Sequence, residues 1–285
     1  MTEPQAPRAD QLWPGRILDR GFFDRPGLEV APELLGLVLW HDSPAGLVAA
    51  VLTEVEAYAG LADPASHAYR GKSARNAVMF GPPGHAYVYF TYGMHFCMNL
   101  VCEQAGQASA VLLRAGRVVT GTDLAAGRRQ PRARRAAPAG DTGAPESAGV
   151  AGATGGADGA APVEGAGSVE GAEAAEPGRE VLPARAASPG RARRVLAERD
   201  LARGPARLCQ ALGVDRSLDG ADVCGTGTPL GIGAPPGWAP AAASEISTGP
   251  RVGVSQAAEV PWRFWLTREP TVSVYRRSVP RRRAR

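Results

Sequence analysis

The chain of 285 residues is poor in several residue types, and lysine is the extreme case, since Lys72 is its only lysine. A lysine that acts as a nucleophile must be activated by an apolar pocket or by neighbouring cations. Lys72 stands instead in a polar stretch, "YRGKSARN". The sequence therefore disfavours covalent chemistry through a lysine Schiff base.

Cysteine and histidine are also scarce, with four residues of each. Cys97, Cys102, Cys209 and Cys224 form no C-x-x-C pair, and neither they nor the histidines have the spacing of metal ligands. Scattered thiols are typical of proteins in a reducing compartment. We therefore expect no metal, no cofactor and a cytoplasmic location, associated with the nucleoid if the protein is bacterial.

Long apolar runs are absent as well. No stretch approaches the roughly 18 apolar residues that a membrane helix needs. The first residues, "MTEPQAPRADQLWPG", carry acids and prolines without an apolar core, so we expect no signal peptide. We expect a soluble protein without a membrane partner.

Glycine and proline, by contrast, are abundant, with 36 and 25 residues, and they cluster. Residues 128–190 consist mainly of Ala, Gly, Pro, Glu and Ser, a composition that cannot bury enough apolar surface to offset the entropy of ordering. We predict that they form a disordered insertion in one folded domain, which comprises residues 15–127 and 191–279. Residues 1–14 are expected to be a flexible N-terminus, and residues 280–285 a basic tail. The net charge of +4 is weak evidence for a polyanionic partner.

Apolar alternation predicts most of the secondary structure. Pro32 is expected in the first turn of a short helix that ends at Gly36, and a second helix should run from Pro205 to Gly213. "GTGTPLGIG" resembles a nucleotide-binding loop, but it lacks the strand-then-helix context of one. Strands are expected in "LGLVLW", "GLVAAVLTEVEAYAG", "AYVYFTYGMHFCMNLVC" and "SAVLLRAGRV", with two more strands and a loop in "TGPRVGVSQAAEVPWRFWL" and "TVSVYRR".

Two acids, Glu54 and Glu56, lie two residues apart in the second of these strands, so alternation places them on one face. Three interpretations are open. The acids could be exposed positions of a strand, an acid pair as in inverting glycosidases, or one structural acid beside one catalytic base.

The long polar segment 61–85 follows these acids, and loops of this length are usually functional or disordered. Its cations Arg70, Lys72 and Arg75 are candidates for phosphate contacts, although a solvated loop would have the same composition. Together with the neighbouring tyrosines they suit a flipped nucleobase and its phosphates.

The stretch from "TEVEAYAG" to "YVYFTYGMHFCMN", with "AVLLRAGRV", "ARGPARLCQALGV" and "PRVGVSQAAEVPWRFWL", resembles the alkyladenine (3-methyladenine) DNA glycosylase family. The resemblance extends from about residue 22 to residue 273, without the insertion. It implies an α+β fold: a single domain with a curled, largely antiparallel β-sheet and peripheral helices.

The resemblance also implies residue roles. Glu56 matches the general base that activates water, and Arg114 and the backbone of Val252 match positions that hold this water and Glu56. The base pocket is expected to contain Tyr58, His67, Tyr89, Asn99 and Leu112. Tyr92 matches the side chain that fills the gap left in the duplex, and Met94 matches the DNA surface.

The implied function is that of a monomeric, monofunctional DNA glycosylase of base-excision repair. It would flip alkylated purines such as 3-methyladenine and 7-methylguanine out of double-stranded DNA and release them, leaving an abasic site. The alternatives are a catalytically inactive module that binds DNA damage, and sugar hydrolysis by Glu54 and Glu56 together. Under the leading interpretation, Glu54 is a supporting or solvated residue.

Overall fold

The computed structural model describes residues 15–91, 93–130 and 196–278. The predicted N-terminal segment, Tyr92, almost all of the predicted insertion and the basic tail lie outside these residues. Helix α4, Thr122–Arg129, continues past the predicted domain boundary at residue 127. Arg128 on this helix donates to the Ala211 carbonyl oxygen at 3.1 Å and to Ser43 Oγ at 2.6 Å, so the helix end packs against the domain.

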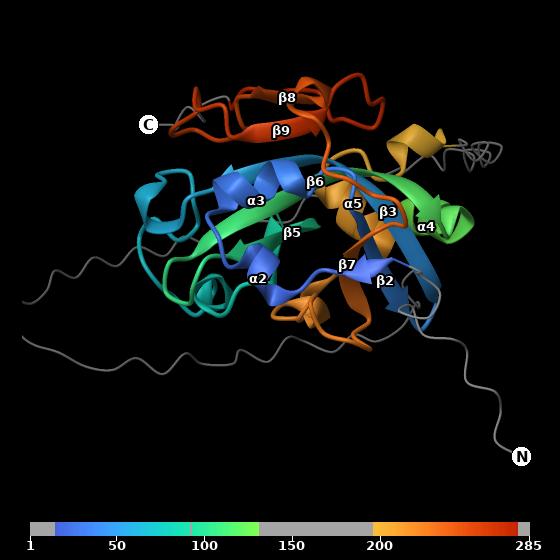
Figure 1. The fold of residues 1–285 in the computed structure, drawn as a ribbon, viewed down its shortest axis with the longest axis horizontal. Helices are drawn as coiled ribbons and strands as arrows, with labels where there is room; N and C mark the ends of the chain where they lie inside the picture. Colours follow the sequence, from blue (N-terminus) through green and yellow to red (C-terminus); the bar gives the residue numbers. More distant parts are fainter. Residues whose placement is uncertain (1–14, 92, 131–195, 279–285) are drawn as a thin grey trace, which may run out of the picture. The chain divides into compact units, whose positions relative to one another are not determined.

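The described residues form one nine-stranded sheet in the order β1-β7-β2-β3-β6-β5-β4, with β9 paired to β3 and β8 paired to β9 (Figure 1). All of the strand pairings are antiparallel. The sheet is not closed into a barrel, and the α+β class with an antiparallel sheet is confirmed. The strands are β1 Arg16–Ile17, β2 Val38–Ser43, β3 Gly46–Tyr58, β4 Ala86–Thr91, β5 His95–Cys102, β6 Ser109–Thr120, β7 Leu230–Ala234, β8 Ile246–Gly249 and β9 Arg263–Leu266.

Strand β3 lies at the centre of this sheet. Along one edge it pairs with β6, and along the other edge its first half pairs with β2 and its second half with β9. Its second half carries Glu54 and Glu56, which therefore have a strand on both sides. The register with β6 is irregular on either side of Glu54, and such bulges re-aim side chains near functional sites.

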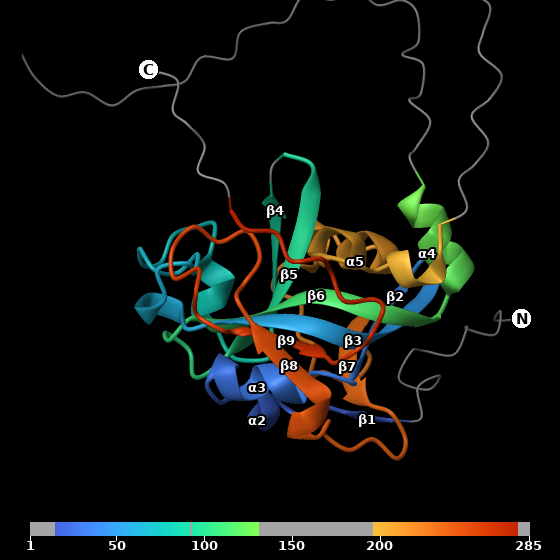
Figure 2. The same cartoon turned by 90° about the horizontal axis from the view of Figure 1, so that it is seen from above.

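Helices lie on both sides of the central strands. Figure 2 shows α2, Arg20–Phe23, and α3, Gly27–Glu33, on one side of β3 and β6, and α5, Pro205–Leu212, on the other. Helix α5 was predicted correctly: Pro205 begins it, and Gly213 ends it with a φ of 73°, which favours glycine. Its apolar stripe of Leu208, Cys209, Ala211 and Leu212 is buried in the main core.

Two local predictions were wrong, and strand β7 was not predicted. Pro32 lies in the last turn of α3 and not in its first, because the helix begins at Gly27, directly after Pro26. Strand β7, "LGIGA", pairs with β2 through residues that include Leu230 and Ile232. Residues 271–277 form no strand.

Three of the four cysteines, Cys97, Cys102 and Cys209, are buried, and all four are free thiols. No helix in the described part of the chain has the length and apolarity to cross a membrane.

Candidate active site

A pocket of about 490 Å³ opens between the end of β3, the hairpin β4–β5, the N-terminus of α5 and the segment 252–256. Seven of the residues predicted for the site line it: Tyr58, His67, Tyr89, Asn99, Leu112, Arg114 and Val252. The chain segments that carry them are far apart in sequence. The fold therefore brings the predicted catalytic and base-pocket residues to one place.

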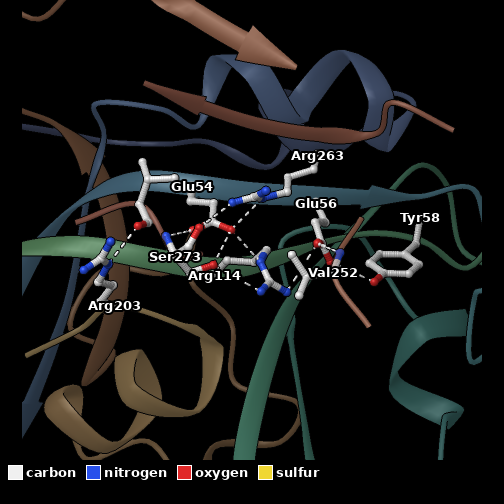
Figure 3. Close-up of polar contacts among 9 residues, drawn as sticks. Glu54, Glu56, Tyr58, Arg114, Arg203, Val252, Arg263 and Ser273 are labelled. Atoms are coloured by element: carbon white, nitrogen blue, oxygen red, sulfur yellow. Dashed lines mark hydrogen bonds and ion pairs between the residues drawn. The ribbon is translucent and has the colours of Figure 1, made fainter. Parts of the chain in front are cut away.

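Glu56 lies directly behind the wall of this pocket and is fully buried. Its Oε1 accepts a hydrogen bond from the Val252 backbone N–H at 2.6 Å and lies 3.3 Å from Arg114 Nη1. Its Oε2 accepts one from the Tyr58 hydroxyl at 2.9 Å (Figure 3). All three partners of the carboxylate line the pocket, so Glu56 is fixed at the boundary of the cavity by the groups that form that boundary.

Glu54 is also fully buried, which contradicts the expectation that it could be solvated. It accepts hydrogen bonds from Arg114 Nε at 2.7 Å and from Arg263 Nε at 2.8 Å. Two more come from the backbone N–H of Ser273 at 2.6 Å and its hydroxyl at 2.8 Å. Burial alone would raise the pKa of Glu54, but the two guanidinium groups and the Ser273 N–H hold it below its usual value.

These contacts disfavour the acid-pair interpretation. Three of the four donors to Glu54 belong to Arg263 and Ser273, which do not line the pocket, whereas all three partners of Glu56 line it. The contacts of Glu54 therefore favour a supporting role over that of a second catalytic acid.

Arg114 connects the two acids, since its guanidinium contacts Glu54 on one side and Glu56 on the other. Burial would lower its pKa, but both carboxylates raise it, so the group stays charged. Both acids contact the same arginine, so Glu54 and Glu56 lie on one face of β3, as alternation predicted.

Aromatic rings form the wall beside this charged cluster. The rings of Tyr87 and Tyr89 stack with centroids 5.3 Å apart, and the His67 ring lies edge-on to Tyr89 at 4.6 Å. His67 Nδ1 is 3.2 Å from the Tyr87 hydroxyl. Desolvation by these rings and the charge of Arg75 lower the pKa of His67, which favours the neutral imidazole.

The Tyr58 ring is held from behind by Arg251, a residue that sequence reasoning missed. Its guanidinium lies 4.6 Å from the centre of the Tyr58 ring and 5.0 Å from that of Trp262. It also forms a two-pronged ion pair with Asp63, and both side chains are fully buried. Because Val252 is the next residue, this pair fixes the backbone N–H that holds Glu56.

Of the predicted DNA-contacting residues, Tyr92 lies outside the described residues, and the other four do not line the pocket. Arg70, Lys72 and Arg75 are exposed, and Arg75 makes one long contact to the Phe90 carbonyl oxygen at 3.5 Å. Met94, in the turn between β4 and β5, is 68% exposed. Within residues 15–91, 93–130 and 196–278, no cluster of His, Cys, Asp and Glu could hold a metal ion.

Comparison with known proteins agrees with this geometry. The family described as methylpurine-DNA glycosylase (MPG) matches residues 21–151 and 169–270. The chain belongs to this family. The matched residues extend into the predicted insertion from both sides, so the family's pattern covers more of the segment than the sequence indicated.

Three similar proteins each carry the name "Putative 3-methyladenine DNA glycosylase". The one from Streptomyces avermitilis is 44% identical over 93% of this chain and 95% of its own length. Those from Frankia casuarinae and Leifsonia xyli subsp. xyli are both 42% identical, over 88% and 90% of this chain and 90% and 92% of their own lengths. This glycosylase is thus a DNA-repair hydrolase that acts on N-glycosyl bonds in DNA.

Proposed function

We propose that the enzyme removes alkylated purines, 3-methyladenine and 7-methylguanine among them, from double-stranded DNA. In this proposal the damaged nucleotide is flipped into the pocket, and a water activated by Glu56 attacks C1′ of its sugar. The base leaves and an abasic site remains. The observation that carries the proposal is a buried carboxylate, Glu56, held at the wall of an aromatic pocket by Val252, Arg114 and Tyr58.

The aromatic wall favours a cationic base. Alkylation at N3 or N7 gives a purine a positive charge, and an aromatic face attracts a cation by about 0.5–2 kcal/mol. A neutral His67 adds no opposing charge beside the rings. The pocket volume of about 490 Å³ also lies in the usual range for small-molecule sites.

The charged cluster supplies the chemistry. A cationic purine is a good leaving group, so one general base is sufficient, and such a base contributes about 10²- to 10⁴-fold. The negative charge of Glu56 also stabilises the positive charge that develops on the sugar. Glu56 is covered by its partners, but catalytic contacts often take their final geometry only when substrate binds.

The predicted DNA-contacting residues support recognition of the duplex. Exposed cations contact phosphates, and an apolar side chain can occupy the space of an extruded base. Arg70, Lys72 and Arg75 fit the first role, and Tyr92 is proposed for the second. Met94, which is exposed, fits a contact to the DNA surface. We propose that the enzyme binds the duplex through this surface as a monomer.

The deciding experiment is Glu56→Gln, measured by single-turnover release of 3-methyladenine from a defined duplex. We expect a loss of at least about 100-fold, with binding of an abasic-analogue duplex within about threefold of wild type. Glu33→Gln is the matched control, because Glu33 pairs with Arg25 at 33–39% exposure, away from the pocket. It should leave both quantities unchanged.

Full release activity in Glu56→Gln would remove Glu56 as the base. Binding without release in the wild-type protein would instead favour the inactive damage-binding module. The same assay with duplexes containing 7-methylguanine or neutral hypoxanthine measures how far the pocket depends on the charge of the base.

A further inference from the structure

The guanidinium of Arg114 is shared unequally between two carboxylates (Figure 3). Its Nε lies 2.7 Å from Glu54 Oε1, whereas its Nη1 lies 3.3 Å from Glu56 Oε1. The shorter contact is a hydrogen bond of good length and the longer one is not. The orientation of Arg114 is therefore set by Glu54 more than by Glu56.

Glu54 can set this orientation because it is itself immobile. It is fully buried, and three donors besides Arg114 fix its two oxygens: Arg263 Nε, the Ser273 N–H and the Ser273 hydroxyl. Arg263 also donates to the Ser273 carbonyl oxygen at 2.7 Å, and its guanidinium lies 4.7 Å from the centre of the Trp265 ring. The acid is thus a rigid anchor behind the pocket.

We propose that Glu54 is a positioning residue of this active site, which orients Arg114 toward Glu56 and the pocket. The proposal rests on the proposed role of Glu56 as the base. An arginine side chain has many rotamers, and carboxylates favour a two-pronged contact with it. Without Glu54, the Arg114 fork is free to close on both oxygens of Glu56 and to engage the lone pairs that the water needs.

The segment that follows β9 takes part in this arrangement. The Ser273 hydroxyl lies 3.3 Å from Arg114 Nη2, so it contacts both Arg114 and Glu54. Arg203 Nε donates to the preceding Val272 carbonyl oxygen at 2.8 Å. Segment 271–273 thus holds Glu54 and Arg114 in one polar cluster.

The first test is Glu54→Gln, which keeps the size of the side chain and removes its charge. We expect single-turnover release of 3-methyladenine to fall about 10- to 100-fold, the order of loss that a small displacement of a reacting group produces. Binding of an abasic-analogue duplex should stay within about threefold of wild type, since Glu54 does not line the pocket. Release within threefold of wild type would overturn the proposal.

A second variant separates positioning from charge balance and also covers the case in which Glu54→Gln does not fold. Glu54→Gln combined with Arg263→Gln removes one buried charge of each sign. Arg114 and Glu56 then remain as a neutral pair. If Glu54 serves only to neutralise Arg263, release returns to within threefold of wild type and the proposal is wrong. If it positions Arg114, release stays at least 10-fold low in this folded, charge-balanced protein.

The third arm tests whether Glu54 acts through Arg114. Adding Glu54→Gln to Arg114→Gln should reduce release by less than about threefold further, because residues that act as a unit are not additive. Independent, multiplicative losses would contradict a positioning role. Failure of the proposed role of Glu56 can be told apart from failure of the role of Glu54. If Glu56→Gln keeps full release, Glu56 is not the base. If Glu56→Gln is inactive but Glu54→Gln is fully active, only the positioning role of Glu54 is wrong.

Discussion

Two groups of charged residues use charge in opposite ways. The first, called the floor, lies behind the pocket wall and comprises Glu54, Glu56, Arg114, Asp63 and Arg251; these residues are at most 5% exposed, and each has a partner of opposite sign. The second, called the rim, comprises the exposed cations Arg70, Lys72 and Arg75. Buried charges are costly unless paired, whereas exposed ones cost little to keep free. The paired charges of the floor therefore fix the side chains around the pocket in place, and the cations of the rim stay available to bind a polyanion.

The largest effect in this comparison is expected from Asp63→Asn. The variant leaves the Arg251 charge buried without its carboxylate, and breaking a buried pair in this way costs about 3–5 kcal/mol. Chemical denaturation measures this free energy of unfolding. Asp222→Asn is the matched control, because the Arg20–Asp222 pair is 32–41% exposed and should contribute about 1 kcal/mol or less. Equal losses in the two variants would contradict the distinction between buried and partly exposed charge pairs.

A smaller effect, on rate, is expected from Arg114→Gln. The substitution removes the cation that contacts Glu56 and the pocket, and loss of one such electrostatic group typically costs about 10²- to 10³-fold in rate. Single-turnover release should fall by this factor while affinity for an abasic-analogue duplex changes little. A variant that loses affinity and keeps its release rate would place Arg114 in binding rather than in chemistry.

The smallest effect is expected at the rim, from Lys72→Ala. If Lys72 contacts a phosphate, the slope of log affinity against log salt concentration should decrease by about 1, with release from the bound complex unchanged. Titrations at several salt concentrations measure this slope. Arg117→Ala is the control, because Arg117 is 55% exposed on β6 and pairs with Glu269. If the slope for Lys72→Ala equals that of the wild type, Lys72 is a solvated charge that contacts no phosphate.

The floor also shows which features local sequence could predict and which it could not. Alternation along β3 correctly placed Glu54 and Glu56 on one face, because the period of a strand depends only on its own backbone. It could not show that β9 would cover the second edge of that strand. The partners of Glu54 lie 60, 209 and 219 residues away, so its burial has no local signal.

The same reason explains the misplaced strand in "TVSVYRR". Its β-branched alternation favours a strand. Some of its backbone groups bond to side chains instead, and none pairs with a neighbouring strand. The Ser273 N–H donates to Glu54, and the Val272 carbonyl oxygen accepts from Arg203. Arg251 and Asp63 were missed for a related reason: each appears as an ordinary polar residue until the fold joins positions that are 188 residues apart.

The resemblance to the glycosylase family supplied what alternation could not. It selected Glu56 over Glu54 and named the pocket residues that the fold then brought together. Tyr92, which it assigned to the gap in the duplex, lies outside the described residues, and its role stays a prediction.

Segment 271–276 has a consequence for the order in which the enzyme becomes active during its synthesis. Ser273 closes the contacts around Glu54, and the Arg276 carbonyl oxygen accepts from the Gly253 N–H beside Val252. Pairings between such distant residues form late. A nascent chain that still has this segment inside the ribosome therefore lacks the contacts that hold Arg114 and the Val252 loop. Under the proposed function, release of a base therefore cannot begin before residues 271–276 have emerged.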